Sequence, residues 1–320
     1  MAAQICDIVM EGGGVKGIGL VGALSVLSAS GYNFRRIAGT SAGAIVGSLV
    51  AAGIPVSALE KLMSDIRYGE FRDEGFLDRL GFIGKGLSLV FEKGVYEGEA
   101  LREWLKDQLA QAGVHTFGDL KVEEDWCQQV PAEQRYRLVV IVADVSRGRL
   151  VRLPWDYKDY GLDPDSQSVA DAVRASMSIP FFYEPVRMKG NYLVDGGILS
   201  NFPIDLFDST PDHPTFGIKL SAKPEANLAV NPVRNSVELA RAVIATMANA
   251  HDMMHLDDPC TIDRTMFVDT MKIKPTDFDI SPKHQKQLFL SGQKGAAAFL
   301  KRWSPEHHQR ICQAHSPLEA

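Results

Sequence analysis

The sequence predicts an α/β fold with a mostly parallel central sheet. The prediction rests on residues 5–53, in which short apolar runs alternate with segments that carry apolar residues at helical spacing. The runs Ile5–Met10 and Phe34–Ala38 are the strand candidates, and a glycine-containing turn and a helix follow each of them. Parallel strands need a crossover, usually a helix, so both turns lie at the same edge of the sheet. Open α/β sheets bind their ligands at this edge.

The elements of the first half follow from spacing and stop signals. Val15–Ser30 has apolar residues at helical spacing and precedes a glycine, and the apolar helix Ala44–Ala52 is closed in the same way. Further helices are expected at Pro55–Tyr68 and Gly98–Gln111, each with an apolar face. The remaining elements expected here are the helical turn Thr116–Leu120, the buried strand Arg137–Asp144 and the strand Leu150–Pro154, which pairs back as a hairpin.

The second half continues with helices and short strands. Ser168–Met177 is a helix with Ser168 as its N-cap, and Pro180 ends it. The runs Phe181–Val186 and Asn191–Val194 are strands around a turn. The last elements expected are the strand Thr215–Leu220, the helix Val233–His255, strand material in Thr261–Ile273 and the helix Ser281–Trp303.

The chain is expected to form one domain over residues 1–303, followed by a loosely attached C-terminal tail over residues 304–320. Residues 69–93 are irregular and contain an apolar, glycine-rich stretch. A long loop of this kind in a compact domain is often a cap or lid over the active site. The alternative is a packed element of the core, because exposed and buried apolar runs look alike in sequence.

Composition and charge exclude several classes of protein. The formal net charge of −6 argues against nucleic acid as the main partner and against purely electrostatic docking to a membrane. The chain shows neither a secretory signal nor a run of about 20 apolar residues that could span a membrane, which favours a cytoplasmic location. Export without a cleavable signal stays open. The scattered cysteines form no CxxC motif and are expected to be reduced thiols or small buried hydrophobes: Cys6, Cys127, Cys260 and Cys312.

The segment Gly39-Thr40-Ser41-Ala42-Gly43 fits the pattern of a nucleophile elbow. Its glycines permit a sharp turn between strand and helix, and the turn lifts the serine above the sheet at a helix N-terminus. The expected context is present, with a strand before the turn and a helix after it. The alternative is an ordinary tight turn with a helix-capping serine.

The segment Gly12-Gly13-Gly14-Val15-Lys16-Gly17 allows three interpretations. A dinucleotide-binding loop requires an acidic residue about 20 positions further on, and none occurs between Glu11 and Glu60. A P-loop requires Gly-Lys-Ser/Thr, whereas here the lysine precedes the last glycine. The remaining use of free N–H groups at a helix N-terminus is to hold a developing anion, as in an oxyanion hole.

These blocks resemble those of the patatin-like phospholipase family. The glycine loop and the elbow are followed in family order by the segment Ala175–Pro180 and by Asp195-Gly196-Gly197, so that the resemblance spans Glu11 to Pro203. It implies a three-layer α/β/α fold with a mostly parallel sheet. It also implies a lipid acyl hydrolase of lipid metabolism that needs neither metal nor cofactor and uses a Ser–Asp dyad of Ser41 and Asp195.

The resemblance assigns further roles around this dyad. The oxyanion hole would come from the loop of Gly12, Gly13, Gly14, Lys16 and Gly17, the elbow from Gly39, Thr40, Ala42 and Gly43, and the loop of the catalytic aspartate from Gly196 and Gly197. Lys16 could add a positive field to the oxyanion or be a solvated surface lysine. A carboxylate with an ordinary pKa near 4 is a weak base, so Asp195 is expected to be partly desolvated.

Several alternatives remain open at this level. A Ser–Asp–His triad would use His213, His251 or His255, and the last two lie at the i, i+4 spacing of zinc ligands. The substrate could be a soluble ester or thioester, or the chain could be a lipid-binding pseudoenzyme. The expected partners are a lipid or phospholipid substrate and a transient peripheral contact with a membrane, and the sequence identifies no activating protein.

Overall fold

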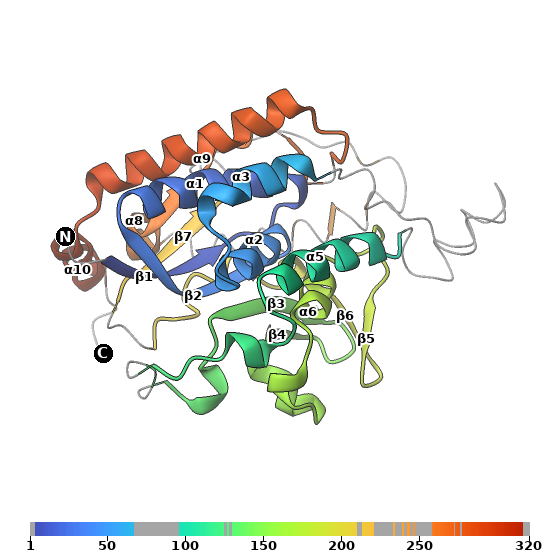
Figure 1. Cartoon of the computed structure of the whole chain (residues 1–320). Coiled ribbons are helices and arrows are strands. Elements are labelled where there is room, and N and C mark those ends of the chain that lie inside the picture. The colour runs from blue at the N-terminus through green and yellow to red at the C-terminus, as the bar shows by residue number, and fades with distance from the viewer. Residues whose placement is uncertain are drawn as a thin grey trace.

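The structure is a computed structural model of the whole chain (Figure 1). It describes residues 4–66, 96–209 except 125, 126, 128 and 129, 213–220 and 258–315 except 272 and 276, together with isolated positions between 233 and 246. Three expectations fall outside the described residues: the lid at 69–93, most of the helix at 233–255, and the histidine pair His251 and His255.

The N-terminal alternation of strands and helices is confirmed. Strand β1 (Gln4–Met10) leads through a 3-10 turn, η1 (Gly14–Gly17), into helix α1 (Ile18–Ala29). Strand β2 (Tyr32–Thr40) then leads directly into helix α2 (Ala42–Ala51). β1 and β2 pair in parallel, so the glycine loop and the serine turn do leave the same edge of the sheet.

A mixed sheet of eight strands forms the centre of the molecule. Its order is β5-β6-β3-β2-β1-β7-β8, and β4 pairs with the other side of β3. The strands that join β1 and β2 in the parallel part are β3 (Leu138–Asp144), β7 (Thr215–Lys219) and β8 (Thr265–Phe267). The antiparallel strands are β4 (Arg149–Leu153), β5 (Val186–Met188) and β6 (Asn191–Asp195).

Helices cover the sheet in a three-layer α/β/α arrangement (Figure 1). Helices α1, α3 and α9 lie together above the sheet in this view, and α5 and α6 lie below them beside β3 and β6. α1 and α9 pack very closely, because a Cβ atom on Gly22 would collide with the carbonyl oxygen of Phe289 and one on Gly292 with that of Gly19. The bounds of the remaining helices are α3 (Val56–Asp65), α5 (Glu99–Gln111), α6 (Val169–Ser176), α8 (Pro259–Asp263), α9 (Pro282–Arg302) and α10 (Pro305–His315).

One strand prediction is wrong in its extent, and another region holds a helix as well as the strand expected there. The strand expected at Phe181–Val186 begins only at its last residue, because Phe181 has a φ of 65°, which is incompatible with an extended chain. The strand material expected in Thr261–Ile273 is confirmed as β8 (Thr265–Phe267), while the start of this region belongs to α8. Asp258 starts that helix by accepting hydrogen bonds from the next backbone N–H groups, a capping signal that the strand prediction overlooked.

The C-terminal region also corrects two expectations. Residues 305–315 form helix α10, so this part of the predicted tail is ordered secondary structure packed against α8. Cys312 of α10 forms a disulfide with Cys260 of α8 across 52 positions of sequence, so the expectation of reduced thiols is wrong for this pair. Cys6 and Cys127 are free and buried, as expected. The cysteine pattern gave no sign of the disulfide, because the fold rather than a short motif brings its partners together.

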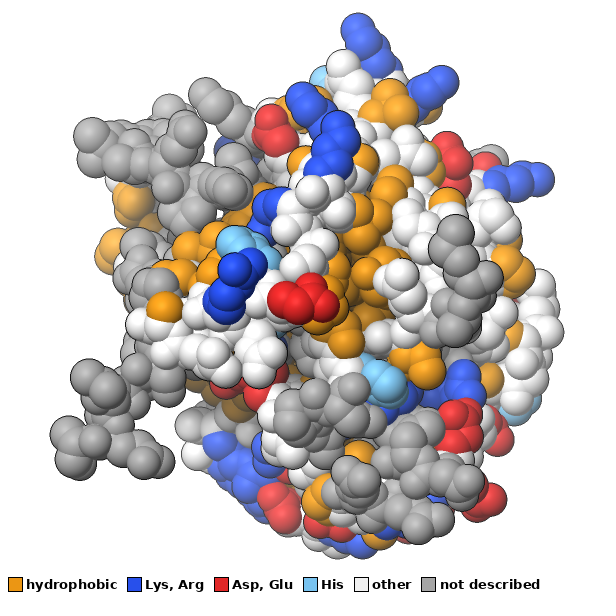
Figure 2. Space-filling model, turned by 90° about the vertical axis from the view of Figure 1, so that its left-hand side faces the viewer, with side chains coloured by type: hydrophobic (Ala, Val, Ile, Leu, Met, Phe, Trp, Pro, Cys, Tyr) orange, Lys and Arg blue, Asp and Glu red, His pale blue; other side chains and the backbone are white. Residues whose placement is uncertain are grey.

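Among the described helices, none offers an apolar stretch sufficient to cross a bilayer. On the face that carries α10, hydrophobic side chains form a strip among charged and polar ones (Figure 2).

Candidate active site

The pairing of β3 brings the two predicted catalytic residues together. β2 and β6 pair with successive parts of the same edge of β3. The pairing with β2 ends where Thr40 lies opposite Ile141, and the pairing with β6 begins at the next residue, where Asp195 lies opposite Val142. Because β2 is parallel to β3 and β6 is antiparallel to it, the C-terminal ends of β2 and β6 meet head to head. Ser41 follows β2 directly and Asp195 ends β6, so sheet register alone places them side by side.

Ser41 has the backbone of a nucleophile elbow. Its φ of 54° and ψ of −120° lie in a region that non-glycine residues rarely occupy, and such strain is found at functional sites. The turn is also too tight for side chains at its flanks. A Cβ atom on Gly39 would collide with the backbone of Gly43, and one on Gly43 would collide with the carbonyl oxygen of Met10.

The segment that follows α6 fixes both residues. The N–H of Ser41 donates to the hydroxyl of Ser176 at 2.8 Å, and this hydroxyl donates to the carbonyl of Ile141 at 2.7 Å. Two positions later, the carbonyl of Ser178 accepts a hydrogen bond from the N–H of Asp195 at 2.9 Å. One short segment therefore holds the backbone of the nucleophile candidate and that of the base candidate.

The Ser41 hydroxyl has two acceptors within reach. Its Oγ lies 3.3 Å from Sδ of Met177, and the carboxylate of Asp195 lies close enough for the Ser41 hydroxyl to lower the pKa of that carboxylate. A thioether is a weak acceptor, whereas a carboxylate is a strong one. Ser41 is 3 % exposed and Asp195 is 6 % exposed, so both side chains are shielded from bulk water.

Burial raises the pKa of Asp195 to about 6, against an ordinary value of 3.8. Hydrogen bonds from the N–H of Gly197, at 2.8 Å, and from Ser41 oppose this shift because they stabilise the charged form. The expected desolvation of Asp195 is confirmed. Gly196 makes the approach possible, since a Cβ atom there would lie against the carbonyl of Ile141.

The glycine loop lies over the elbow. A Cβ atom on Gly12 would lie 3.1 Å from Cβ of Ser41. The N–H of Gly12 donates to the carbonyl of Asn201 at 3.2 Å, and the Asn201 amide donates back to Gly12 at 3.2 Å. Within the part of the chain that the structure describes, the N–H groups of Gly13 and Gly14 have no acceptor. These two N–H groups, and not that of Gly12, are available to an oxyanion.

Two contacts hold this loop in its shape. Gly14 has a φ of 53°, and the next N–H, that of Val15, donates to the carbonyl of Pro275 at 3.1 Å. Gly17 marks the contact with the elbow helix, because a Cβ atom there would lie 3.3 Å from Cβ of Ala42. The absence of a side chain at Gly17 thus leaves room for the elbow helix. This packing role differs from the role in anion binding that the resemblance implies for Gly17.

Lys16 is not a solvated surface lysine. Its Nζ lies 3.5 Å from the carbonyl of Leu220, and burial lowers the pKa of its amine. A Cβ atom on Gly13 would lie 3.2 Å from Cε of Lys16, so the amine lies near the free N–H groups. Below it, Glu11 and Lys219 form a buried ion pair that anchors the end of β1 to β7.

No histidine in the described residues hydrogen-bonds to Ser41 or Asp195. The structure therefore does not place His213 in a triad with them.

Sequence reasoning missed several residues that support the site. Ser176, Met177 and Asn201 lie in segments that the motif comparison marked, but nothing in their spacing revealed their contacts. Pro275 gave no signal, because its contribution is a backbone carbonyl that the fold carries to the glycine loop from a distant part of the chain.

Comparisons with known proteins identify the family and the fold of the chain. The family model of patatin-like phospholipases matches residues 8–208. The uncharacterized protein YqhO of Bacillus subtilis is 34% identical over 302 residues, a match that covers 93% of this chain and 99% of that protein. The lysophospholipase NTE1 of Eremothecium gossypii is 26% identical, over 64% of this chain but only 11% of its own length. The crystal structure of VipD from Legionella pneumophila superposes with a TM-score of 0.54 at 18% identity, covering 94% of this chain and 67% of VipD, and shows the same fold.

Proposed function

Because the chain belongs to the patatin-like phospholipase family, we propose that it is a serine acyl hydrolase that cleaves carboxylic ester bonds of phospholipids or other lipids. The family and the lysophospholipase relatives support lipid ester hydrolysis in general. The proposal adds the residues: Ser41 as nucleophile, Asp195 as base, and the N–H groups of Gly13 and Gly14 as the oxyanion hole.

The observation that carries the proposal is the pairing of Ser41 with a buried, basic carboxylate. A serine hydroxyl is a weak nucleophile and needs an adjacent base. Asp195 lies within reach of this hydroxyl and has a pKa of about 6, much closer to neutral pH than that of a free carboxylate. The strained backbone of Ser41 keeps the hydroxyl in place above the sheet.

In the first half of the reaction, Ser41 Oγ attacks the ester carbonyl as Asp195 takes the hydroxyl proton. The carbonyl oxygen becomes an oxyanion, which the N–H groups of Gly13 and Gly14 stabilise by hydrogen bonds, with the nearby Lys16 amine adding a favourable field. The bond to the leaving alcohol then breaks, and Asp195 returns the proton to that alcohol. An acyl ester on Ser41 remains.

In the second half, water replaces the alcohol. Asp195 removes a proton from this water as it attacks the acyl carbonyl, and the same N–H groups stabilise the second oxyanion. When the bond to Ser41 breaks, Asp195 returns the proton to Oγ, and the fatty acid leaves. One carboxylate thus acts as base and acid in turn, with no net change in the enzyme.

The proposed substrate is a lipid, met by transient contact with a membrane. The match with the lysophospholipase covers 11% of that protein, so its head-group preference is not carried over. A soluble ester or thioester is the alternative substrate, and surface dependence distinguishes the two. Hydrolysis of a lipid ester should accelerate when the substrate passes from monomers to micelles or vesicles, whereas soluble-ester hydrolysis should not.

Fluorophosphonate labelling followed by intact mass measurement tests the proposed residues. The wild type should gain one adduct, Ser41→Ala should gain none, and Asp195→Asn should react much more slowly. Ser200→Ala is the matched control, because Ser200 is buried nearby but its hydroxyl has no hydrogen-bond partner. Adduct formation on Ser41→Ala would refute Ser41 as the nucleophile. A folded wild type that binds vesicles but neither reacts nor hydrolyses lipid would indicate a lipid-binding protein instead.

A further inference from the structure

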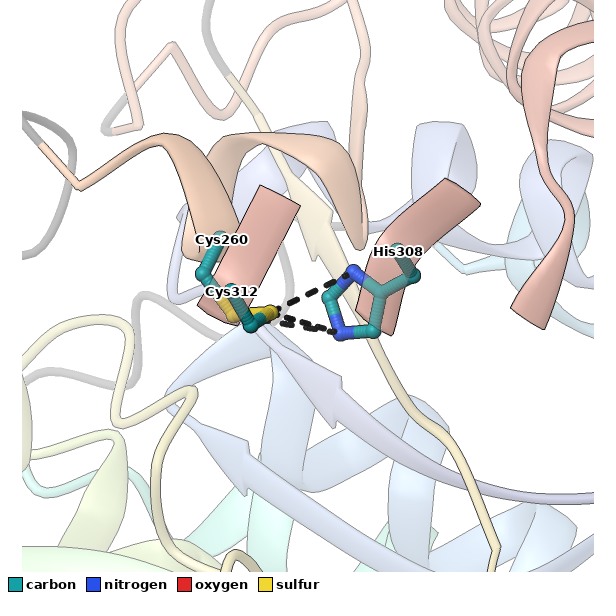
Figure 3. Close-up of side chains that lie close together, drawn as sticks. All are labelled: Cys260, His308 and Cys312. Carbon is teal, nitrogen blue, oxygen red and sulfur yellow. Dashed lines mark hydrogen bonds between the residues drawn. A yellow bond between two sulfur atoms is a disulfide. The ribbon is translucent and has the colours of Figure 1, made fainter. Parts of the chain in front are cut away.

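A second cluster of reactive side chains lies where α10 meets α8. Cys260 belongs to α8, and His308 and Cys312 lie one turn apart on α10 (Figure 3). The sulfur and imidazole nitrogen atoms of the three side chains lie within 4.8 Å of one another. The cluster is half-buried, so that it is accessible to an ion from solvent.

His308 is held toward the sulfur atoms by a buried carboxylate. Its Nδ1 lies 3.0 Å from Oδ2 of Asp263, which is 5% exposed. Arg302 pairs with the other oxygen of Asp263 at 3.0 Å, which fixes the carboxylate in turn. When Nδ1 of the neutral imidazole donates to this carboxylate, Nε2 is the nitrogen that keeps its lone pair. Histidines that bind metals share this arrangement, with one ring nitrogen on the metal and the other donating to a carboxylate.

The distances from His308 to the two sulfur atoms suit a small thiophilic cation once the bond between the sulfur atoms is broken. Nε2 of His308 lies 3.5 Å from Sγ of Cys312 and 3.9 Å from Sγ of Cys260. In a tetrahedral zinc site, Zn–S bonds of about 2.3 Å and Zn–N bonds of about 2.0 Å separate sulfur and nitrogen ligands by about 3.6 Å. Two sulfur ligands and one imidazole are a ligand set that Zn²⁺ favours, and a water molecule can complete the tetrahedron.

We propose that Cys260, His308 and Cys312 form a redox-controlled binding site for a thiophilic divalent cation such as Zn²⁺. The disulfide of the structure is the oxidised form of this site. A thiol or phosphine reductant breaks the S–S bond by supplying two electrons, and two protons from water complete the two thiols. Binding of the cation releases these protons, because thiolates are the ligands. Both the disulfide and the bound cation would link α10 to α8.

A purely structural disulfide accounts for less of the geometry. It needs no histidine beside it and no buried carboxylate to orient the ring. In a reducing compartment, moreover, a pair of this kind persists as thiols, and there cysteine and histidine clusters more often bind metals.

Metal uptake by the full chain in both redox states tests the proposal. After reduction with a phosphine and removal of oxygen, the protein should bind one equivalent of Co²⁺ with the ultraviolet absorption of thiolate-to-cobalt charge transfer. Zn²⁺ should displace the Co²⁺ and abolish this absorption, and the oxidised protein should bind neither ion. His308→Ala should weaken binding by more than the tenfold to hundredfold loss expected for Asp263→Asn, which keeps the imidazole but removes the carboxylate that orients it and pairs with Arg302.

Two matched controls isolate the cluster. His307→Ala alters the exposed neighbour of His308 on the same helix, and Cys127→Ser alters a free, buried cysteine elsewhere, so both should bind as the wild type does. His308→Ala keeps both cysteines and can still form the disulfide, so its circular dichroism should match that of the wild type. The proposal is overturned if the reduced, folded protein, with its thiols reactive to Ellman's reagent, takes up no metal. It is equally overturned if His308→Ala binds with unchanged affinity.

Discussion

At the residue scale, the site depends on a carboxylate that the fold makes more basic. The main cause is burial, and the hydrogen bonds from Gly197 and Ser41 oppose it. A free aspartate with a pKa of 3.8 would remove the Ser41 proton with much less driving force. A carboxylate with a pKa of about 6 is still mostly deprotonated at pH 7, so it combines basicity with the correct charge state.

This pKa predicts the pH dependence of the proposed reaction. Only the deprotonated form of Asp195 can act as the base, so kcat/KM should be constant above about pH 7 and fall about tenfold for each pH unit below about 6. Initial rates on a soluble ester between pH 4.5 and 9, with folding monitored by circular dichroism, measure this profile. A profile that is flat down to pH 4.5 would exclude Asp195 as the base.

The same burial predicts an effect on stability. The folded-state pKa of about 6 lies above the ordinary 3.8, so the folded state bears the cost of the buried charge above about pH 6 and loses this cost as the pH falls toward 4. The difference corresponds to about 3 kcal/mol. Asp195→Asn removes the charge but can still accept the hydrogen bond from Gly197. It should therefore raise the free energy of unfolding by about 2 to 3 kcal/mol at pH 8 and by less than about 1 kcal/mol at pH 4.

Urea denaturation at the two pH values measures this difference. Asp205→Asn is the control, because it removes a carboxylate at an exposed position and should have little effect at either pH. If Asp195→Asn raised the free energy of unfolding equally at pH 8 and pH 4, the buried charge would not be the cause of the increase.

Sequence reasoning at the residue scale succeeded where the requirement is local. The strained turn at Ser41 follows from the glycines on either side of it, and both lie within two residues. It did not reveal the partner of Gly12, whose N–H donates to the carbonyl of Asn201, 189 positions away. Which N–H groups of a glycine loop remain free is thus decided by tertiary contacts that the loop sequence does not contain.

At the element scale, the segment between α6 and β6 joins the two halves of the site. Ser176 bridges the N–H of Ser41 and the carbonyl of Ile141, and Ser178 holds the backbone of Asp195. The segment therefore couples the elbow to β3 and to the end of β6. Changes in its hydrogen bonds should affect the reaction although the segment itself supplies neither the nucleophile nor the base.

Ser176→Ala tests this coupling. The variant leaves the N–H of Ser41 buried without its partner and takes the Ser176 hydroxyl from the carbonyl of Ile141, so it should lower the free energy of unfolding by about 2 kcal/mol. Displacement of the elbow should lower kcat by between about tenfold and a hundredfold with a smaller change in KM. Ser200→Ala removes a buried hydroxyl without a partner and should leave both quantities nearly unchanged. Wild-type kcat in a folded Ser176→Ala variant would contradict the coupling.

Elements with a strong local pattern were predicted well. The long amphipathic helix α9 and the apolar strand β3 lie within one residue of their expected bounds, because helical periodicity and continuous apolarity are local signals. The transfer of pairing from β2 to β6 along β3 was not predictable, because register depends on which strands meet. The disulfide between α8 and α10 was missed for the same reason.

At the scale of the whole molecule, the residues that carry the proposed chemistry depend on elements outside the region matched by the family model. That region ends at residue 208, before β7, β8 and α9. Yet β7 is the parallel neighbour of β1 on the side away from β2, and α9 packs against the length of α1. The close approach of Gly22 and Gly292 to the facing backbones leaves no room for a side chain at either contact between α1 and α9. Pro275, also outside the region, holds the glycine loop.

We therefore expect that a fragment of residues 1–208 does not fold, although it contains Ser41, Asp195 and the whole glycine loop. Without β7 and α9, β1 becomes an edge strand and the apolar residues of α1 lose the surface that covers them. Its urea unfolding should show no cooperative transition, it should bind 1-anilinonaphthalene-8-sulfonate, and it should fail to react with a fluorophosphonate.

The control is a fragment of residues 1–303, which keeps the sheet and α9, lacks α10, and corresponds to the proposed domain. This fragment should unfold cooperatively and react at Ser41. If residues 1–208 unfolded cooperatively and reacted at the same rate, the site would be independent of the C-terminal elements, and the packing of α9 on α1 would serve stability alone.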